Sequence, residues 1–210
     1  VDEGEDCDDG RNGDDADGDE TIYVTDFYAR PNGTQKEATD TARVARVFAV
    51  DATTLTSTEI FLQPTVIDLP GVMVAGGNPG DPTLDLASNT SAYPNQLYAC
   101  AINDGKLYVT AVGASPASFN HTTEFHQNVH GLVYAIDTAT NTVDDSQLAN
   151  LSELVQALPA AGVANEGRRF SAVSHDIAFV PGTDFGYVAS LTANMLLRVN
   201  YSGATPVAGA

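Results

Sequence analysis

Apolar and polar positions alternate in the same way in three stretches of this chain. Each stretch opens with a short strand pattern around a Tyr-Val pair, at Ile22–Thr25, Leu107–Thr110 and Gly186–Ala189. A second apolar strand that ends in an acidic or amide residue follows each time, at Arg46–Asp51, Leu132–Asp137 and Met195–Asn200. Self-similarity of this kind is typical of a repeat architecture.

Further strands complete each repeat. A strand at Gln96–Ile102 and an Asn-Asp-Gly turn precede the second Tyr-Val strand, and an Asp-Gly turn between alternating runs predicts a hairpin. The remaining strands are predicted at Ser174–Val180, before the third Tyr-Val pair, and at Ser57–Leu62 and Thr142–Asp145 on the outer edges. Each repeat is therefore expected to be an antiparallel meander of four strands.

Tandem four-stranded antiparallel units predict an all-β fold like a β-propeller, with about three blades present. A β-sandwich is the alternative, because the same short strands could build one. The repeated strand order favours the propeller. One short helix is expected near 147–158, where leucines recur at helical spacing, and the Pro/Gly/Asn-rich residues 63–95 are expected to form a loop.

The connection after the Tyr-Val strand differs in length between repeats. It measures 25 residues from Tyr23 to Phe48, 26 from Tyr108 to Tyr134 and 10 from Tyr187 to Leu197. Two repeats therefore carry matched insertions in an equivalent connection, and such connections emerge on one face of a propeller. Insertions gathered on one face often mark a binding face.

Three blades make an incomplete ring, because closed propellers have about four to eight. Open edges would expose unpaired strand groups. We therefore expect the ring to continue after Ala210, or the chain to be a processed piece of a longer propeller. Completion by a separate chain is the remaining alternative.

The formal net charge of −19 argues against nucleic acid or an anionic membrane as a partner. No apolar run reaches the roughly 18–20 residues of a membrane span, so no membrane insertion is expected. Because the chain starts at Val1, we expect a mature or excised product. Cys7 and Cys100 could form one disulfide in an oxidising compartment or remain two separate thiols.

The segments Tyr23–Thr25, Tyr108–Thr110 and Tyr187–Ala189, with the strand-and-turn segments Phe48–Thr54 and Tyr134–Asn141, carry a family resemblance. At these residues the chain resembles the YVTN-type β-propellers, a bacterial and archaeal family of exported or surface proteins. The resemblance covers about residues 21–205. It implies an extracellular, cell-surface or periplasmic location. Some longer relatives join such a propeller to c-type cytochrome domains, but this chain has no Cys-X-X-Cys-His, so no covalent haem is expected.

Residues 1–20 form an acidic, Asp/Gly-rich leader that precedes the propeller region 21–210. The leader holds eleven acidic residues and one Arg. Calcium prefers six to eight oxygen ligands, and Asp alternating with Gly can direct several carboxylates into one tight loop. The calcium ligands predicted here are Asp6, Asp8, Asp15, Asp17 and Asp19. The alternative is a solvated tail of like charges.

Three histidines lie inside the second insertion. His121, His126 and His130 surround Glu124, and imidazoles with a carboxylate suit copper or zinc. Three polar loop residues are the alternative. His175-Asp176 is a further pair that could be catalytic or could pin neighbouring blades together.

These observations favour an exported or cell-surface scaffold for binding or assembly, stabilised by calcium and not itself catalytic. Its partners would be other proteins or the remainder of a longer propeller chain. The alternative is a component of a surface electron-transfer or copper-handling system. In that system the histidine loop would hold the metal, or a c-type cytochrome would be the partner.

Overall fold

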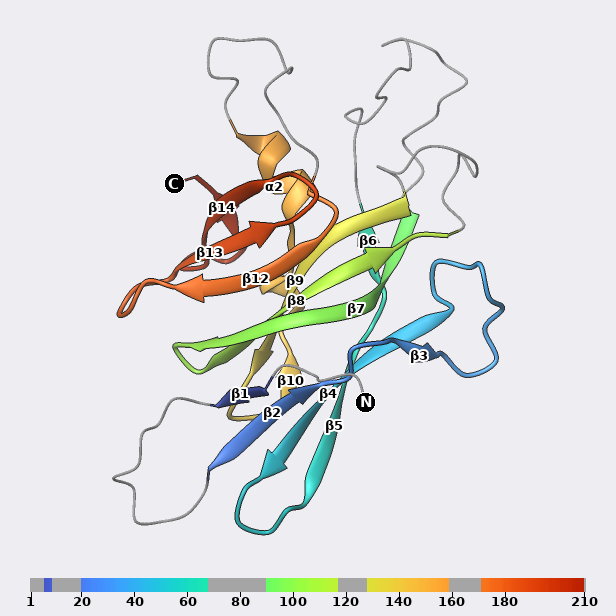
Figure 1. The fold of residues 1–210 in the computed structure, drawn as a ribbon, viewed down its shortest axis with the longest axis vertical. Coiled ribbons are helices and arrows are strands. Elements are labelled where there is room, and N and C mark those ends of the chain that lie inside the picture. The colour runs from blue at the N-terminus through green and yellow to red at the C-terminus, as the bar shows by residue number, and fades with distance from the viewer. Residues whose placement is uncertain (1–5, 9–19, 68–89, 117–127, 159–170, 210) are drawn as a thin grey trace.

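The computed structural model describes residues 6–8, 20–67, 90–116, 128–158 and 171–209, which form three antiparallel sheets (Figure 1). The first sheet runs β1 (Asp6–Asp8), β2 (Thr21–Thr25), β4 (Arg43–Asp51), β5 (Ser57–Leu62), and β3 (Arg30–Pro31) also pairs with β4. The middle sheet runs β7 (Thr90–Asn103), β8 (Lys106–Ala114), β9 (Val129–Asp137), β10 (Thr142–Val143). The short strands β6 (Thr65–Ile67) and β11 (Ala149–Asn150) join its β7 and β9. The third sheet runs β12 (Ser174–Phe179), β13 (Phe185–Ser190), β14 (Met195–Asn200), β15 (Val207–Ala208).

The predicted all-β fold of tandem antiparallel sheets, each of about four strands, is confirmed, and the described ranges include one short helix where it was predicted. The outer strand predicted at Ser57–Leu62 matches β5 residue for residue. The helix is shorter than predicted. Its core is α2 (Leu151–Ala157), and the residues before it form a separate 3-10 turn, η1 (Asp145–Gln147).

All three Tyr-Val strands pair with the next long strand in the same register. Tyr23 lies opposite Ala49, Tyr108 opposite Ala135, and Tyr187 opposite Arg198. The valines also share one register: Val24 lies opposite Phe48, Val109 opposite Tyr134, and Val188 opposite Leu197. Because side chains alternate between the faces of a sheet, each sheet has one face with the tyrosine and one with the valine. We call these the Tyr face and the Val face.

The sheets stack so that each Tyr face covers the Val face of the sheet that follows. Tyr23 and Val47 of the first sheet share one core with Val109 and Tyr134 of the middle sheet. A second core joins the Tyr face of the middle sheet to the Val face of the third; its members include Tyr108, Val133, Val188 and Leu197. Burial of both faces of the middle sheet explains why β8 and β9 are nearly continuous apolar runs.

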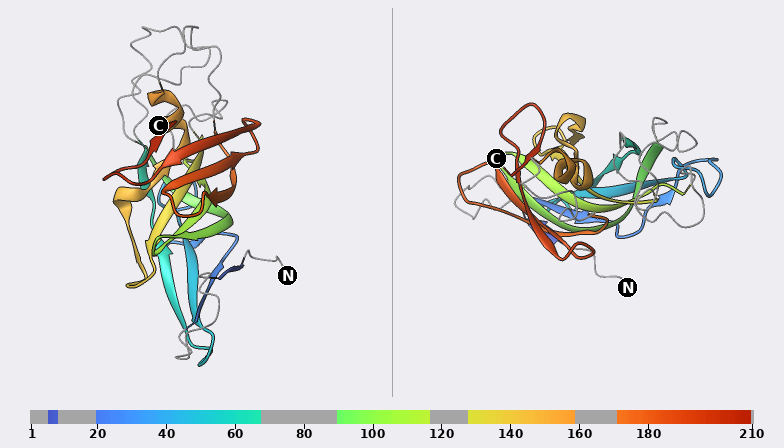
Figure 2. Two further views of the ribbon diagram at one scale, coloured as in Figure 1. Left: turned by 90° about the vertical axis from the view of Figure 1, so that its left-hand side faces the viewer. Right: turned by 90° about the horizontal axis from the view of Figure 1, so that it is seen from above.

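The stacking order sets the outline of the molecule. In the left view of Figure 2 the first sheet, blue to cyan, and the third sheet, red, lie at opposite ends with the middle sheet between them. Two faces of the stack are therefore left at its ends. They are the Val face of the first sheet and the Tyr face of the third.

Helix α2 closes the edge of the second core. Asn150 caps it, since its side-chain oxygen accepts a hydrogen bond from the backbone N–H of Ser152. Leu151 and Val155 lie four residues apart on the face that packs into the second core. No helix within the described ranges is long and apolar enough to cross a bilayer.

Part of the acidic leader belongs to the first sheet. Residues Asp6–Asp8 form β1 and pair with β2, where Cys7 lies opposite Tyr23. Cys100 on β7 is disulfide-bonded, and Cys7 is the only other cysteine of the chain. The bridge that the sequence left open is therefore formed, and it ties the first sheet to the middle sheet.

Candidate functional site

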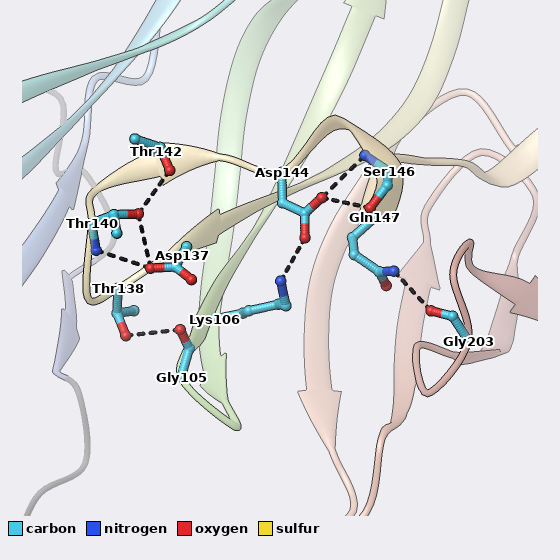
Figure 3. Close-up of polar contacts among 10 residues, drawn as sticks. All are labelled: Gly105, Lys106, Asp137, Thr138, Thr140, Thr142, Asp144, Ser146, Gln147 and Gly203. Carbon is cyan, nitrogen blue, oxygen red and sulfur yellow. Dashed lines mark hydrogen bonds and ion pairs between the residues drawn. The ribbon is translucent and has the colours of Figure 1, made fainter.

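A capped turn follows the long inner strand in the first and middle sheets. In the middle sheet the Asp137 carboxylate accepts hydrogen bonds from the backbone N–H and the hydroxyl of Thr140, each at 2.9 Å (Figure 3). In the first sheet Asp51 accepts from the backbone N–H groups of Thr53 and Thr54 at 2.9 and 2.7 Å. These bonds, led by those of Thr140 and Thr54, lower the pKa of both aspartates. Such a repeated arrangement builds the same turn in both sheets.

A second polar group links the middle and third sheets at the same end. Lys106 forms an ion pair with Asp144, whose other oxygen accepts from the hydroxyl and backbone N–H of Ser146 (Figure 3). The hydrogen bond from Lys106 is the main cause of a lowered pKa at Asp144. Next to it the buried Gln147 donates to the carbonyl of Gly203 at 2.9 Å. Gly203 lies in the turn after β14, so this bond joins neighbouring sheets.

Tyrosine hydroxyls make the polar contacts between the first and middle sheets. Tyr23 donates to the side-chain oxygen of Asn141 at 2.9 Å and approaches the carbonyl of Thr138 at 3.3 Å. Tyr134 of the middle sheet donates in the opposite direction, to the carbonyl of Gln63 at 3.0 Å. The two bonds fix the offset of one sheet on the other.

The equivalent tyrosine of the middle sheet uses ring contacts instead. The Tyr108 ring lies 4.6 Å from the rings of both Tyr201 and Phe179, measured between centroids. Burial raises the pKa of Tyr108 to about 12, with smaller contributions from Asp184 and Asp144. The cluster is an apolar joint between the middle and third sheets.

A row of aromatic side chains crosses all three sheets on the surface. Phe27, after β2, contacts Tyr28 edge-on at 4.7 Å and Tyr98 of β7 at 5.3 Å. Tyr98 in turn contacts His175 of β12 at 5.3 Å. Tyr28 and His175 are exposed, whereas Phe27 and Tyr98 are half-buried. We call these four residues the aromatic row.

Backbone hydrogen bonds hold the aromatic row in place. The amide of Leu97 donates to the carbonyl of Phe27 at 3.0 Å, and Ala29 donates to Asn95 at 2.9 Å. The segment around Phe27 therefore extends the middle sheet through β7. This pairing lets a residue of the first insertion lie beside Tyr98, far from it in sequence.

An ionic network lies on the Val face of the first sheet. Asp26 pairs with Arg30 and Arg46, each at 2.8 Å, and Arg46 also reaches Glu59 at 3.1 Å. Burial alone would raise the pKa of Asp26, yet the hydrogen bonds and charges of the two arginines hold it below its usual value. The Arg46 guanidinium lies 5.0 Å above the ring of Phe48.

The residues predicted to bind calcium are only partly described. Asp6 and Asp8 lie on β1, paired with Val24 and Ile22. The other three predicted ligands, Asp15, Asp17 and Asp19, lie outside the described residues. Among the residues that the structure describes, no three or more His, Cys, Asp or Glu side chains gather as a metal site would require.

The histidines are likewise divided. His130 lies on β9 opposite Gly113 and is fully buried. His121 and His126 fall outside the described ranges, so their relation to His130 stays a prediction. The exposed His175 ring lies 5.3 Å from that of Tyr98 on the neighbouring sheet, measured between centroids, while Asp176 accepts from the backbone N–H of Ile177 at 2.8 Å.

Sequence reasoning missed the aromatic row, although one signal was present. Phe27 and Tyr28 open the first insertion directly after a Tyr-Val strand, and paired aromatics in a polar connection indicate a contact surface. The sequence identifies its partner Tyr98 only as a strand residue, because the aromatic neighbours of Tyr98 come from other repeats.

Comparison with known proteins finds no match: no family model, no curated protein and no solved structure matches the chain.

Proposed function

We propose that this chain is a non-catalytic scaffold that binds a protein partner through the aromatic row. The observation that carries the proposal is the row itself, which spans three sheets and is held by backbone pairing. Tyrosine and phenylalanine are enriched in protein interfaces, where they supply large contact areas at a low cost in side-chain entropy. A rigid support for such a row is what a binding surface needs.

We further propose that the scaffold is a β-propeller of the YVTN type. The support is the shared register of the three Tyr-Val strands and the face-to-face order of their sheets. An exported location fits a disulfide-bonded Cys100, because disulfides persist in oxidising compartments.

Calcium bound by the acidic leader would order the start of the first sheet. The support is the position of β1, which brings Asp6 and Asp8 to the edge of β2 next to further aspartates in the sequence. Oxygen-rich clusters of this charge suit a hard cation. Calcium would then act on stability and on the sheet edge, with no part in chemistry.

Calcium binding is tested by isothermal titration of the chain and of a triple variant, Asp15→Asn, Asp17→Asn and Asp19→Asn. Substitution is preferable to deletion of the leader, because deletion would also remove β1. We expect heat of binding in the parent chain and its loss in the variant. Equal heats in both, or none in the parent chain, would refute calcium binding by these residues.

Elemental analysis of the same protein separates calcium from the electron-transfer alternative. Stoichiometric copper, zinc or haem iron would favour the alternative, whereas calcium alone supports the scaffold.

Partner binding is tested on a protein captured by the immobilised chain and then purified. Its affinity is measured by calorimetry for the parent chain, for Tyr98→Ala, and for Leu55→Ala as an exposed control away from the row. Loss of an aromatic interface residue typically weakens binding about tenfold or more. We expect that loss for Tyr98→Ala only; equal affinities for all three would contradict a role of the row.

A further inference from the structure

One turn position recurs in all three sheets, and its residue differs in the third. Asp51, Asp137 and Asn200 end the long inner strand at the same register place, two residues beyond the partner of the Tyr-Val tyrosine. Both aspartates accept hydrogen bonds from the turn that follows. The side-chain oxygen of Asn200 accepts in the same way, from the backbone N–H of Ser202 at 2.9 Å. An amide therefore replaces a carboxylate at this one turn.

The segment Asn200-Tyr201-Ser202 is also an acceptor sequence for an N-linked sugar. Such a sequence needs Asn, any residue except Pro, and then Ser or Thr. Because the motif is short, the structure around each copy has to decide which one can carry a sugar. The chain holds five copies, which begin at Asn32, Asn89, Asn120, Asn150 and Asn200. Those at Asn89 and Asn120 lie outside the described residues, so three can be compared.

The fold leaves no room for a sugar on Asn150. This residue is 4% exposed, and its side-chain oxygen accepts from the backbone N–H of Ser152 as the cap of α2. Its amide nitrogen donates to the Glu153 carboxylate at 3.0 Å. The hydroxyl of Ser152, which completes the acceptor sequence, is itself buried and donates to the carbonyl of Ser171 at 3.1 Å. A sugar here would have to displace the helix cap.

The amide nitrogen of Asn32 is engaged as well. It donates to the carbonyl of Thr41 at 3.1 Å and so closes a loop within the first insertion. A sugar on this nitrogen would compete with that bond.

Asn200 is the described acceptor whose nitrogen is available. Its side-chain oxygen holds the turn, while its amide nitrogen makes no hydrogen bond within the part of the chain that the structure describes. The side chain is half-buried, and residues 202–205 directly after it are exposed. A sugar on this nitrogen would leave the fold beside an exposed turn and break no contact.

Stacking of sheets does not bury this position. Asp51 and Asp137 occupy it in the two sheets whose Tyr faces are covered by the next sheet. Both are still only half-buried, as Asn200 is. The accessibility of Asn200 therefore comes from its place at the end of the strand, whatever covers the face beside it.

We propose that Asn200 is an N-glycosylation site. In the reaction the amide nitrogen of Asn200 attacks the anomeric carbon of an oligosaccharide that an oligosaccharyltransferase holds as its lipid pyrophosphate. A C–N bond forms and the C–O bond to the pyrophosphate breaks. The lipid pyrophosphate leaves with the electron pair of that bond, and the nitrogen gives up one proton. The site goes beyond the binding scaffold and rests on the exported location proposed above.

A sugar at Asn200 would not cover the aromatic row. Asn200 lies opposite Phe185, at one end of the third sheet. His175, the member of the row on that sheet, follows Ser174, which pairs with Ser190 at the other end. The modified chain would keep its contact surface free.

Peptide mapping of the chain purified from its native cells tests the proposal. Trypsin cleaves after Arg198 and so separates Asn200 from the other four acceptor sequences. Electron-transfer fragmentation keeps a sugar on the residue that carries it. We expect a sugar on Asn200 and an unmodified Asn150. A bare Asn200, or a sugar on Asn150, would overturn the proposal.

Three variants expressed in the same cells separate the acceptor sequence from the turn. Asn200→Gln removes the acceptor nitrogen from its position. Ser202→Ala removes the hydroxyl that the motif requires but keeps the backbone N–H that holds the turn. Ser202→Thr is the matched control, because it preserves both. We expect loss of the sugar in the first two variants and its retention in the third. A sugar that persists in Ser202→Ala or Asn200→Gln would contradict the assignment.

The same digest, run without reducing agent, separates failure of the site from failure of the exported location. Cross-linked peptides that contain Cys7 and Cys100, together with a bare Asn200, would refute the sugar and leave the exported scaffold standing. Free thiols at both cysteines, with a bare Asn200, would refute the exported location as well.

Discussion

At the scale of the residue, the tyrosine of each Tyr-Val pair has a different task in each sheet. The Tyr23 hydroxyl donates a hydrogen bond to a turn of the middle sheet, whereas the Tyr108 ring packs against the ring of Tyr201. Tyr187 occupies the same register position at the end of the stack. One sequence motif therefore supplies a hydrogen bond, an apolar joint and a half-buried ring at the end of the stack, depending on what the neighbouring sheet offers.

The hydroxyl of Tyr23 can be removed without changing the ring. We expect Tyr23→Phe to lower the free energy of unfolding by about 1 kcal/mol, because a partly buried hydrogen bond to Asn141 is lost. Urea unfolding measures the change, and Tyr28→Phe, at an exposed position, is the control. Equal stability of the parent chain and Tyr23→Phe would show that the hydroxyl does not fix the two sheets.

Buried tyrosines predict a loss of stability at alkaline pH. Burial raises the pKa of Tyr108 from 10.0 to about 12, and it raises the pKa of Tyr134 and Tyr201 further. A phenol whose pKa is raised in the folded state stabilises fully below pH 10, and that contribution is lost as the pH rises towards 12. Ultraviolet absorbance of tyrosinate and circular dichroism should therefore change together in this window. Complete tyrosine ionisation near pH 10 with the sheets intact would contradict the burial.

At the scale of the element, the short strand β1 joins part of the low-complexity leader to the first sheet. The first repeat has no strand of its own before β2 in the region 21–210, so the leader supplies it. Because β1 pairs with β2, the disulfide between Cys7 and Cys100 links the first sheet covalently to the middle sheet. The bridge fastens a strand that is only three residues long.

Removing the bridge should release β1. A disulfide that closes a long loop, such as the one between Cys7 and Cys100, typically contributes about 2–5 kcal/mol to stability. We expect Cys7→Ser and Cys100→Ser each to lower the free energy of unfolding in that range, and amide exchange of β2 to rise at the edge that β1 covers. A reducing agent should destabilise the parent chain but not the variants. If reduction left β2 protected, other contacts would be holding β1.

Most of the long strands of the three sheets could be predicted from the sequence, because local alternation and turn residues specify them. The Asp-Gly turn between β7 and β8 and the exposed outer strand β5 are examples. β1 could not be predicted, because its residues are polar and its pairing depends on a distant disulfide and on β2. The aromatic row could not be predicted either, because Phe27, Tyr98 and His175 meet only after the three sheets have stacked.

At the scale of the whole molecule, one rule orders the stack: a Tyr face meets the Val face of the next sheet. The rule explains why both faces of the middle sheet are buried and why Leu196 and Phe61 remain exposed at the two ends. It also separates this fold from a β-sandwich, in which two sheets would enclose a single core. This rule is the central claim about the fold.

Nuclear Overhauser contacts in solution test the rule most directly. The Tyr23 ring should show contacts to Thr138 and Asn141, and the Tyr108 ring should show contacts to Phe179 and Tyr201, in one and the same sample. Stereospecific labelling of tyrosine and phenylalanine would keep the rings distinct. Both sets of contacts together would show that the three sheets stack in the order described. Absence of either set, or contacts between Tyr23 and Tyr108 across a single core, would contradict it.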